Sequence, residues 1–119
     1  MSVDLLKLFL FADKEGKLQK TPQRKIFSII DGIIGGENKG PLEPDPVESR
    51  VLIASENMLA ADIVGTRLMG FDPLKIKMFT SLMNDSIWDF GVTEINGIEV
   101  RSADKKIVNC FSETNNKFF

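Results

Sequence analysis

Two stretches of the chain are apolar at both odd and even positions. They span residues 25–34 and 50–55, and β-branched side chains are frequent in both. A strand with one wet face alternates apolar and polar residues, whereas a strand covered on both faces reads as a continuous apolar run. The pattern therefore predicts two buried strands in a mixed or parallel sheet that is covered by helices.

A second pattern predicts helices after these strands. Residues 57–69 are apolar with helical spacing, and Ser55 or Asn57 can cap the first turn. Gly70 suits the left-handed residue that ends a helix. Asp72–Pro73 then matches the N-cap and the first position of another helix. Helices that follow strands in this order indicate an α/β architecture.

The two ends of the chain carry weaker patterns. Residues 5–11 are apolar and predict a short helix or strand that docks on the rest. Residues 94–100 contain Asn96 and Gly97, a pair that suits the type I′ turn, and so predict a C-terminal β-hairpin. We expect residues 1–119 to form a single α/β domain, the usual content of a chain of this length.

Composition narrows the classes of function. The formal net charge of -2 and the pI of ≈ 5.2 argue against nucleic-acid binding, which needs a basic surface. Histidine is absent, so acid–base chemistry would depend on carboxylates, lysine or the backbone. The single cysteine, Cys110, cannot build an iron–sulfur cluster from this chain alone. No apolar stretch is long enough for a membrane span, and one free cysteine fits a reducing compartment, so we expect a cytoplasmic protein.

Segment 31–46 concentrates the polar chemistry of the chain. It begins at the end of the first apolar run and combines glycines, prolines and carboxylates. Glycines let a backbone approach a ligand, and carboxylates are the ligands that hard divalent cations prefer. The candidate ligand-binding residues come from this segment and from the predicted helix that follows it: Asp31, Gly32, Gly35, Gly36, Glu37, Gly40, Asp45 and Asp62. Within this set, the candidate ligands of a divalent cation are Asp31, Glu37 and Asp62.

The spacing of Gly35 and Gly40 is that of a phosphate-binding loop, but the motif is incomplete. Pro41 stands where such a loop needs lysine, and no serine or threonine follows it. The nearby carboxylates would also repel a phosphate. A cation site is therefore the better functional hypothesis, and a solvated acidic loop is the alternative.

Asp31 and Asp62 each allow two interpretations. Asp31 is predicted on the same strand face as Phe27 and Ile29, where an unpaired carboxylate is costly. It would serve either as a ligand beyond the end of the strand or as a cap for backbone N–H groups. Asp62 lies on a helix that is apolar nearly all round, so we expect it to be at least partly buried. It would face segment 31–46 either as a second ligand or as an acceptor for backbone N–H groups there.

Several short motifs occur in one order along the chain. They are Thr21–Arg24, Ile30–Pro41, Asp45–Pro46, Ala61–Asp62 and Arg67–Asp72. These motifs resemble the C-terminal part of the domain-of-unknown-function 362 family, over roughly residues 5–79. The resemblance implies that the chain is a C-terminal fragment of a larger protein or one subunit of a split protein. Many members are described as iron–sulfur proteins with ferredoxin-like cysteine motifs, and because those motifs are missing here, that cofactor does not carry over.

Two functions follow as hypotheses. The first is a ligand- or cation-binding portion of a larger, redox-linked enzyme of this uncharacterised family. The alternative is a non-enzymatic structural or interaction module whose carboxylate–glycine segment only pins the fold. Its partners would be the missing N-terminal part of such a family protein or further copies of the chain. We expect neither nucleic acid nor a membrane as a partner.

Overall fold

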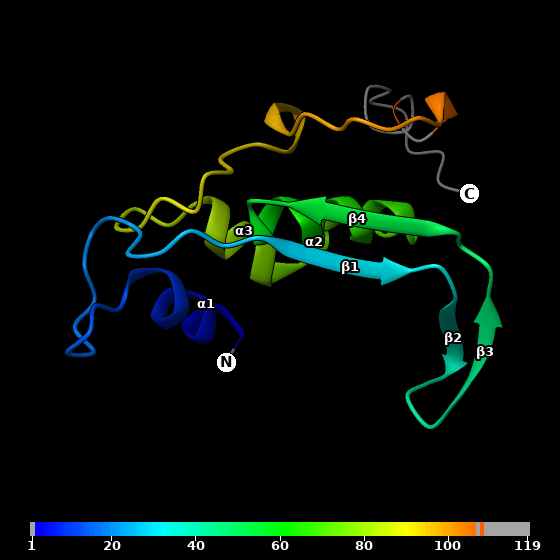
Figure 1. The fold of residues 1–119 in the computed structure, drawn as a ribbon, viewed down its shortest axis with the longest axis horizontal. Helices are drawn as coiled ribbons and strands as arrows, with labels where there is room; N and C mark the ends of the chain where they lie inside the picture. Colours follow the sequence, from blue (N-terminus) through cyan, green and yellow to red (C-terminus); the bar gives the residue numbers. More distant parts are fainter. Residues whose placement is uncertain (1, 107, 109–119) are drawn as a thin grey trace.

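The structure is a computed structural model that describes residues 2–106 and residue 108. Helices and strands are mixed along the chain, so the expected α/β class is confirmed (Figure 1). The elements in order are α1 (Ser2–Phe11), β1 (Ser28–Gly32), β2 (Gly35–Lys39), β3 (Glu43–Val47), β4 (Val51–Ser55), α2 (Met58–Leu68), the 3-10 turn η1 (Pro73–Lys75), α3 (Lys77–Met83) and the 3-10 turn η2 (Ile95–Gly97).

The two predicted strands, β1 and β4, pair with each other, but they run antiparallel. Ile30 lies opposite Ile53, and Ser28 lies opposite Ser55. A parallel pair needs a crossover connection, usually a helix, between its strands. Here the connection is itself a hairpin, formed by β2 and β3, which turns the chain back on itself. The prediction of a mixed or parallel sheet is therefore wrong, and the described residues form two antiparallel sheets of two strands each.

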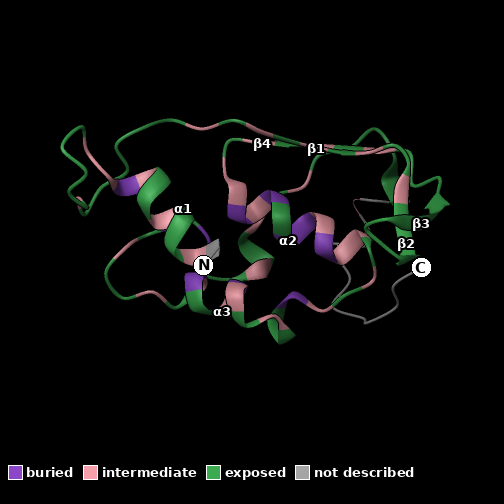
Figure 2. Cartoon of the chain, turned by 90° about the horizontal axis from the view of Figure 1, so that it is seen from below, coloured by how far each residue is buried: buried purple, intermediate pink, exposed green. Residues whose placement is uncertain are grey.

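Only one face of the β1–β4 sheet is covered. Gly65 of α2 packs on the inner face, where a Cβ added to it would lie 3.4 Å from Cδ1 of Ile53. In Figure 2, helices α1, α2 and α3 all lie on the same side of this sheet. On the other side, the side chains of Phe27, Ile29 and Leu52 are exposed. The prediction of strands buried on both faces is therefore wrong for this chain as the structure describes it.

Helix α2 begins and ends as the sequence predicts. The side-chain oxygen of Asn57 accepts a hydrogen bond of 3.0 Å from the backbone N–H of Ala60, which makes it the N-cap. At the other end, Gly70 has a φ of 84°, the left-handed conformation that glycine adopts at low cost. The N–H of Gly70 donates to the carbonyl of Arg67, and that of Phe71 to the carbonyl of Thr66. These bonds satisfy the last carbonyls of the helix.

The core lies beneath the sheet, where α1, α2 and α3 meet the chain around Phe90. Phe11 and Ile63 are completely buried at its centre. The rings of Phe11 and Phe90 make an edge-to-face contact with centroids 5.4 Å apart. The remaining buried members of this cluster are Leu59, Phe79, Leu82 and Val92. Residues 5–11, expected to form either a helix or a strand, thus belong to a helix whose last residue, Phe11, anchors it in the core.

The predicted C-terminal β-hairpin is absent from the described residues. Asn96 and Gly97 belong to the 3-10 turn η2, in which the N–H of Ile98 donates to the carbonyl of Ile95. A type I′ turn needs a positive φ at both central residues, and neither Asn96 nor Gly97 has one. An Asn-Gly pair selects a hairpin only when strands flank it, and no strand of the described chain does so here. Cys110 lies outside the described residues.

Candidate functional site

Asp31 lies near the end of β1, on the face that points away from α2. Its side chain accepts a hydrogen bond of 3.0 Å from the backbone N–H of Ile33, two residues further along. This is the geometry of an aspartate that caps a turn through its own backbone. The next residue, Gly32, is opposite Val51, whose carbonyl oxygen would lie 3.3 Å from an added Cβ. At this part of the candidate site, the side chain of Asp31 and the close approach at Gly32 are therefore both directed at the backbone of the chain itself.

The other carboxylates of segment 31–46 lie on the exposed hairpin of β2 and β3. Glu37 is directly opposite Asp45 in this pair of strands. Asp45 accepts a hydrogen bond of 2.8 Å from the side-chain amide of Asn38. Figure 1 shows the hairpin beyond the end of the β1–β4 sheet, away from the helices. What the sequence suggests as an open loop is thus a regular hairpin, and one of its carboxylates is engaged within it.

The glycines of the hairpin differ in what they do. A Cβ added to Gly36 would lie 2.7 Å from Cβ of Pro44, so the two strands can approach only if this residue is glycine. At Gly35 the nearest atom would be Oγ of Ser49, at 3.2 Å. Gly40 has open space around its Cα. Only Gly36 is therefore required by a close contact, and that contact is with the hairpin itself.

Asp62 lies on an exposed part of α2. The expectation that this residue is at least partly buried holds for its carboxyl group, which its neighbours partly desolvate, although the residue as a whole is exposed. This desolvation raises the pKa of Asp62 above the ordinary value of 3.8. Asp31 is on the outer face of the sheet, whereas α2 covers the inner face, so the sheet lies between that face and the helix that carries Asp62.

The structure gives the proposed metal ligands no common site. No group of three acidic or sulfur-bearing side chains in residues 2–106 or at residue 108 is placed to hold a metal ion. Asp31, Glu37 and Asp62 come from a strand end, a projecting hairpin and a helix. Binding of a ligand or cation by these residues therefore stays a prediction, without support from this arrangement.

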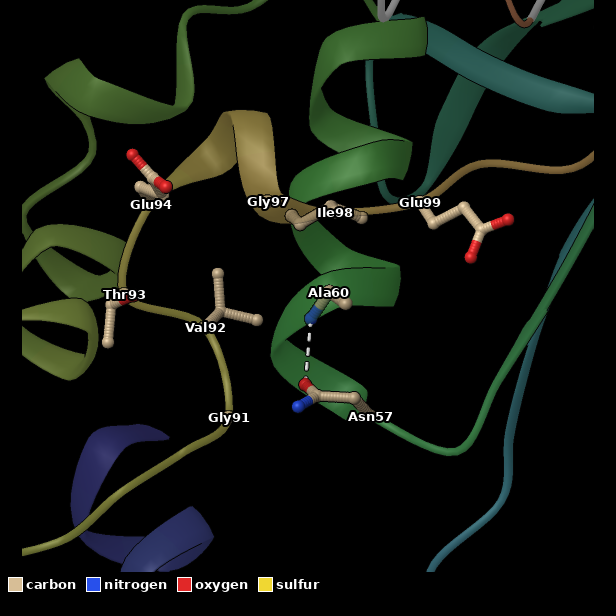
Figure 3. A pocket seen from close by; sticks show the side chains of 9 residues that line it. All are labelled: Asn57, Ala60, Gly91, Val92, Thr93, Glu94, Gly97, Ile98 and Glu99. Atoms are coloured by element: carbon tan, nitrogen blue, oxygen red, sulfur yellow. Dashed lines mark hydrogen bonds between the residues drawn. The ribbon is translucent and has the colours of Figure 1, made fainter.

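An open groove of ≈ 310 Å³ lies elsewhere, between the N-terminal turn of α2 and residues 91–99 (Figure 3). Asn57 forms one wall and holds both sides together: it caps α2, and its amide nitrogen donates a bond of 2.7 Å to the carbonyl of Phe90. Gly91, with a φ of 76°, passes so close that an added Cβ would lie 2.7 Å from that nitrogen. The sequence predicts the cap, but nothing in it reveals a partner 33 residues away.

A second polar contact that the sequence does not reveal joins α1 to the end of α3. The ammonium group of Lys7 lies 2.7 Å from a carboxylate oxygen of Asp85 and 4.7 Å from the centre of the Trp88 ring. The hydrogen bond from Lys7, aided by backbone N–H groups of Ile87 and Trp88, lowers the pKa of Asp85 to about 2. This cluster holds the N-terminal helix on the core, and its charges are matched within it.

No helix in the described part of the chain is both long enough and apolar enough to cross a membrane. The longest of the helices α1, α2 and α3 is α2, which has 11 residues.

Comparison with known proteins gives two matches. A thylakoid-associated protein of Synechocystis sp. is 43% identical over 49 residues, which are 41% of this chain but only 15% of that protein. The chain thus spans a small part of the length of the curated relative that it matches. No solved structure matches it. The model of a domain of unknown function, DUF362, matches residues 3–67, which are more than half of the chain and include both sheets and nearly all of α1 and α2. The chain therefore belongs to the DUF362 family.

Proposed function

We propose that this chain is a structural and interaction module of a DUF362 protein, without catalytic chemistry of its own, in which the carboxylate–glycine segment maintains the fold. The observation that carries this proposal is the use of the carboxylates within the segment. Asp31 accepts a hydrogen bond from the N–H of Ile33, and Asp45 accepts one from Asn38. Gly36 serves the close approach of β2 to Pro44. These contacts are local and need no ligand.

The first hypothesis, a ligand- or cation-binding portion of a larger redox-linked enzyme, has less support. A hard divalent cation takes six or more oxygen ligands, and no trio of candidate ligands is grouped in the described residues. One feature still favours it. Glu37 and Asp45 lie directly opposite each other, and like charges in that position are destabilising unless something neutralises them. The experiment below therefore includes cations.

The module would act by association, in a cytoplasmic protein. The match with the Synechocystis protein covers 15% of that relative, so in a protein of that kind a unit like this one would be a small portion of a larger structure. We propose that the partner is the remaining part of a DUF362 protein, for which this chain supplies a C-terminal portion. Further copies of the chain are the alternative partner.

The test is calorimetric titration of the purified chain with Mg²⁺, Ca²⁺ and Mn²⁺, together with thermal unfolding of three variants. We expect no cation binding. Asp31→Ala removes the acceptor for Ile33 and should cost about 1 kcal/mol of stability, whereas Asp31→Asn keeps an acceptor oxygen and should cost less. Asp62→Asn removes a partly desolvated charge and should leave stability at pH 7 equal or slightly higher. Cation binding that is lost in Asp31→Asn at an unchanged melting temperature would support the enzyme hypothesis instead.

A further inference from the structure

We propose that the outer face of the β1–β4 sheet is a docking surface for a helical layer from the remaining part of a DUF362 domain. The apolar part of the outer face consists of the side chains of Phe27, Ile29, Leu52 and Ala54, and Asp31 lies at its polar end. This inference rests on the proposed function, since it names the surface and the partner through which the module would associate.

The outer face is apolar and open. Phe27 is 64% exposed, Ile29 is 62% exposed and Leu52 is 63% exposed. Ile29 and Ala54 are directly opposite each other in the ladder, and Leu52 is opposite Asp31 at the polar end of the face. Isolated exposed apolar residues are common on proteins, whereas a contiguous apolar patch marks an interaction surface when it is large, and this one continues onto the open strand edges.

The edges of the same sheet are also available. Within the described residues β1 and β4 each have only one neighbour, and neither strand contains a proline. Strand β3 of the hairpin is different, because it carries Pro44 and Pro46. A proline cannot donate to a ladder, so these residues must direct their missing N–H groups away from β2. They thereby protect the outer edge of β3 against a further strand. Strand β3 of the hairpin is thus protected against pairing with a further strand, whereas the edges of β1 and β4 are not.

A helical cover fits the outer face better than other occupants. Strands that helices cover on both faces are apolar at both parities, a pattern best known from parallel sheets, and the antiparallel strands β1 and β4 come from two such runs. Their inner face supplies the precedent, because α2, a helix of 11 residues, covers it. A helix with its side chains is about 10–12 Å across, which matches the width of two strands. The outer face therefore suits a helix of similar length with an apolar stripe.

A second copy of the chain fits less well. Two strands of five residues make a face roughly 17 Å long and about 10 Å wide, from the usual rise and strand spacing. Each partner of a stable interface buries ~800 Å² of accessible surface, which is more than the few side chains of this face supply alone. A longer partner can extend past the face to the strand edges. The Synechocystis relative has that length, since 85% of it lies outside the match, the complement of the 15% that is covered.

The experiment is co-expression of the full chain with the Synechocystis protein from which the 49 matched residues have been deleted, followed by light scattering and a measurement of the Kd. We expect a 1:1 complex. Ile29→Lys or Leu52→Lys should weaken it at least tenfold, whereas Leu42→Lys, at a side chain that is 92% exposed on the hairpin, should not. Absence of a complex, or a complex that tolerates both outer-face variants, overturns the proposal. Self-association of the chain that Ile29→Lys abolishes also overturns it, because the occupant would then be a second copy.

A second measurement guards against misfolding of the deleted relative. In a chimera, the 49 aligned residues of this chain replace their counterparts in the intact Synechocystis protein. Ile29→Lys should lower the melting temperature of the chimera by several degrees more than it does in the isolated chain, and Leu42→Lys should lower neither. Equal effects of the two variants in the chimera contradict the proposal. Because neither experiment involves cations, a failure here is distinguishable from cation binding, which would overturn the proposed function.

Discussion

The two antiparallel sheets of this chain are adjacent in sequence but are built on opposite principles. The β1–β4 sheet is apolar, rests on α2 and leaves one face and two edges open. The β2–β3 hairpin is polar, exposed and protected along one edge by Pro44 and Pro46. The hairpin therefore has the polar composition of a solvent-exposed structure. The β1–β4 sheet has the apolar composition of a buried element. On our proposal, the sheet therefore serves association and the hairpin serves local structure.

The largest expected effect concerns the support beneath the sheet. Ile63 of α2 is completely buried, and truncation of such a side chain typically costs about 2–5 kcal/mol. Ile63→Ala should therefore lower the free energy of unfolding by about that amount in urea denaturation followed by far-UV circular dichroism. Ile34→Ala, at a side chain that is 68% exposed in the link between the sheets, is the matched control. Similar losses for both variants would contradict the described core.

The second largest effect is expected at Asn57, because this residue joins α2, the helix beneath the β1–β4 sheet, to the chain around Phe90. Asn57→Ala removes the N-cap of α2 and the bond to the carbonyl of Phe90. The expected loss is about 1–3 kcal/mol, from the usual values for a cap and for an unsatisfied carbonyl. Asn57→Asp keeps the cap but not the donor, so its thermal unfolding should fall between those of the wild type and the alanine variant. An alanine variant as stable as the wild type would refute both roles.

Asp85 tests how α1 is held on the core. Lys7 and two backbone N–H groups lower its pKa from 3.8 to about 2, so the ionised form is the one that stabilises the fold. Its contribution is complete above the unfolded-state pKa and is lost as the pH falls from 3.8 toward about 2. Asp85→Asn should be less stable at pH 7 and should lose less stability over that acid range. Parallel curves of melting temperature against pH for variant and wild type would be the contrary result.

The smallest expected effect is confined to the hairpin. Gly36→Ala places a Cβ 2.7 Å from Cβ of Pro44, which should force the two strands apart locally. Gly40→Ala meets open space and is the control. Hydrogen exchange should accelerate in β2 for Gly36→Ala alone, with little change in the melting temperature of the core. A large global destabilisation would show that the hairpin is more closely tied to the sheet than the structure indicates.

The sequence predicts local features of this fold better than its spatial arrangement. The start and end of α2 follow from Asn57 and Gly70, whose effects act within one turn. Strands β1 and β4 were also predictable, but not their direction, because that depends on segment 33–50 forming its own hairpin instead of the expected loop. The two-sided apolar pattern of β1 and β4 predicted a cover that no described residue provides on the outer face.

The candidate site illustrates the same limit. Glycines and carboxylates in one segment suggest a ligand-binding site. In the structure, Gly36 allows the close approach of Pro44, and the side chain of Asp31 accepts a hydrogen bond from the backbone N–H of Ile33. Composition cannot distinguish a ligand from such internal partners. Contacts between distant segments, such as Lys7 with Asp85 and Asn57 with Phe90, depend on packing that a single sequence does not reveal.

The most direct test of the central claim is the affinity of three forms of the chain for the deleted Synechocystis protein. If the outer face of the β1–β4 sheet is a docking surface, the wild type and Leu42→Lys should bind with the same Kd, and Ile29→Lys should bind at least tenfold more weakly. Equal binding by all three forms, or no binding by the wild type, would contradict the claim.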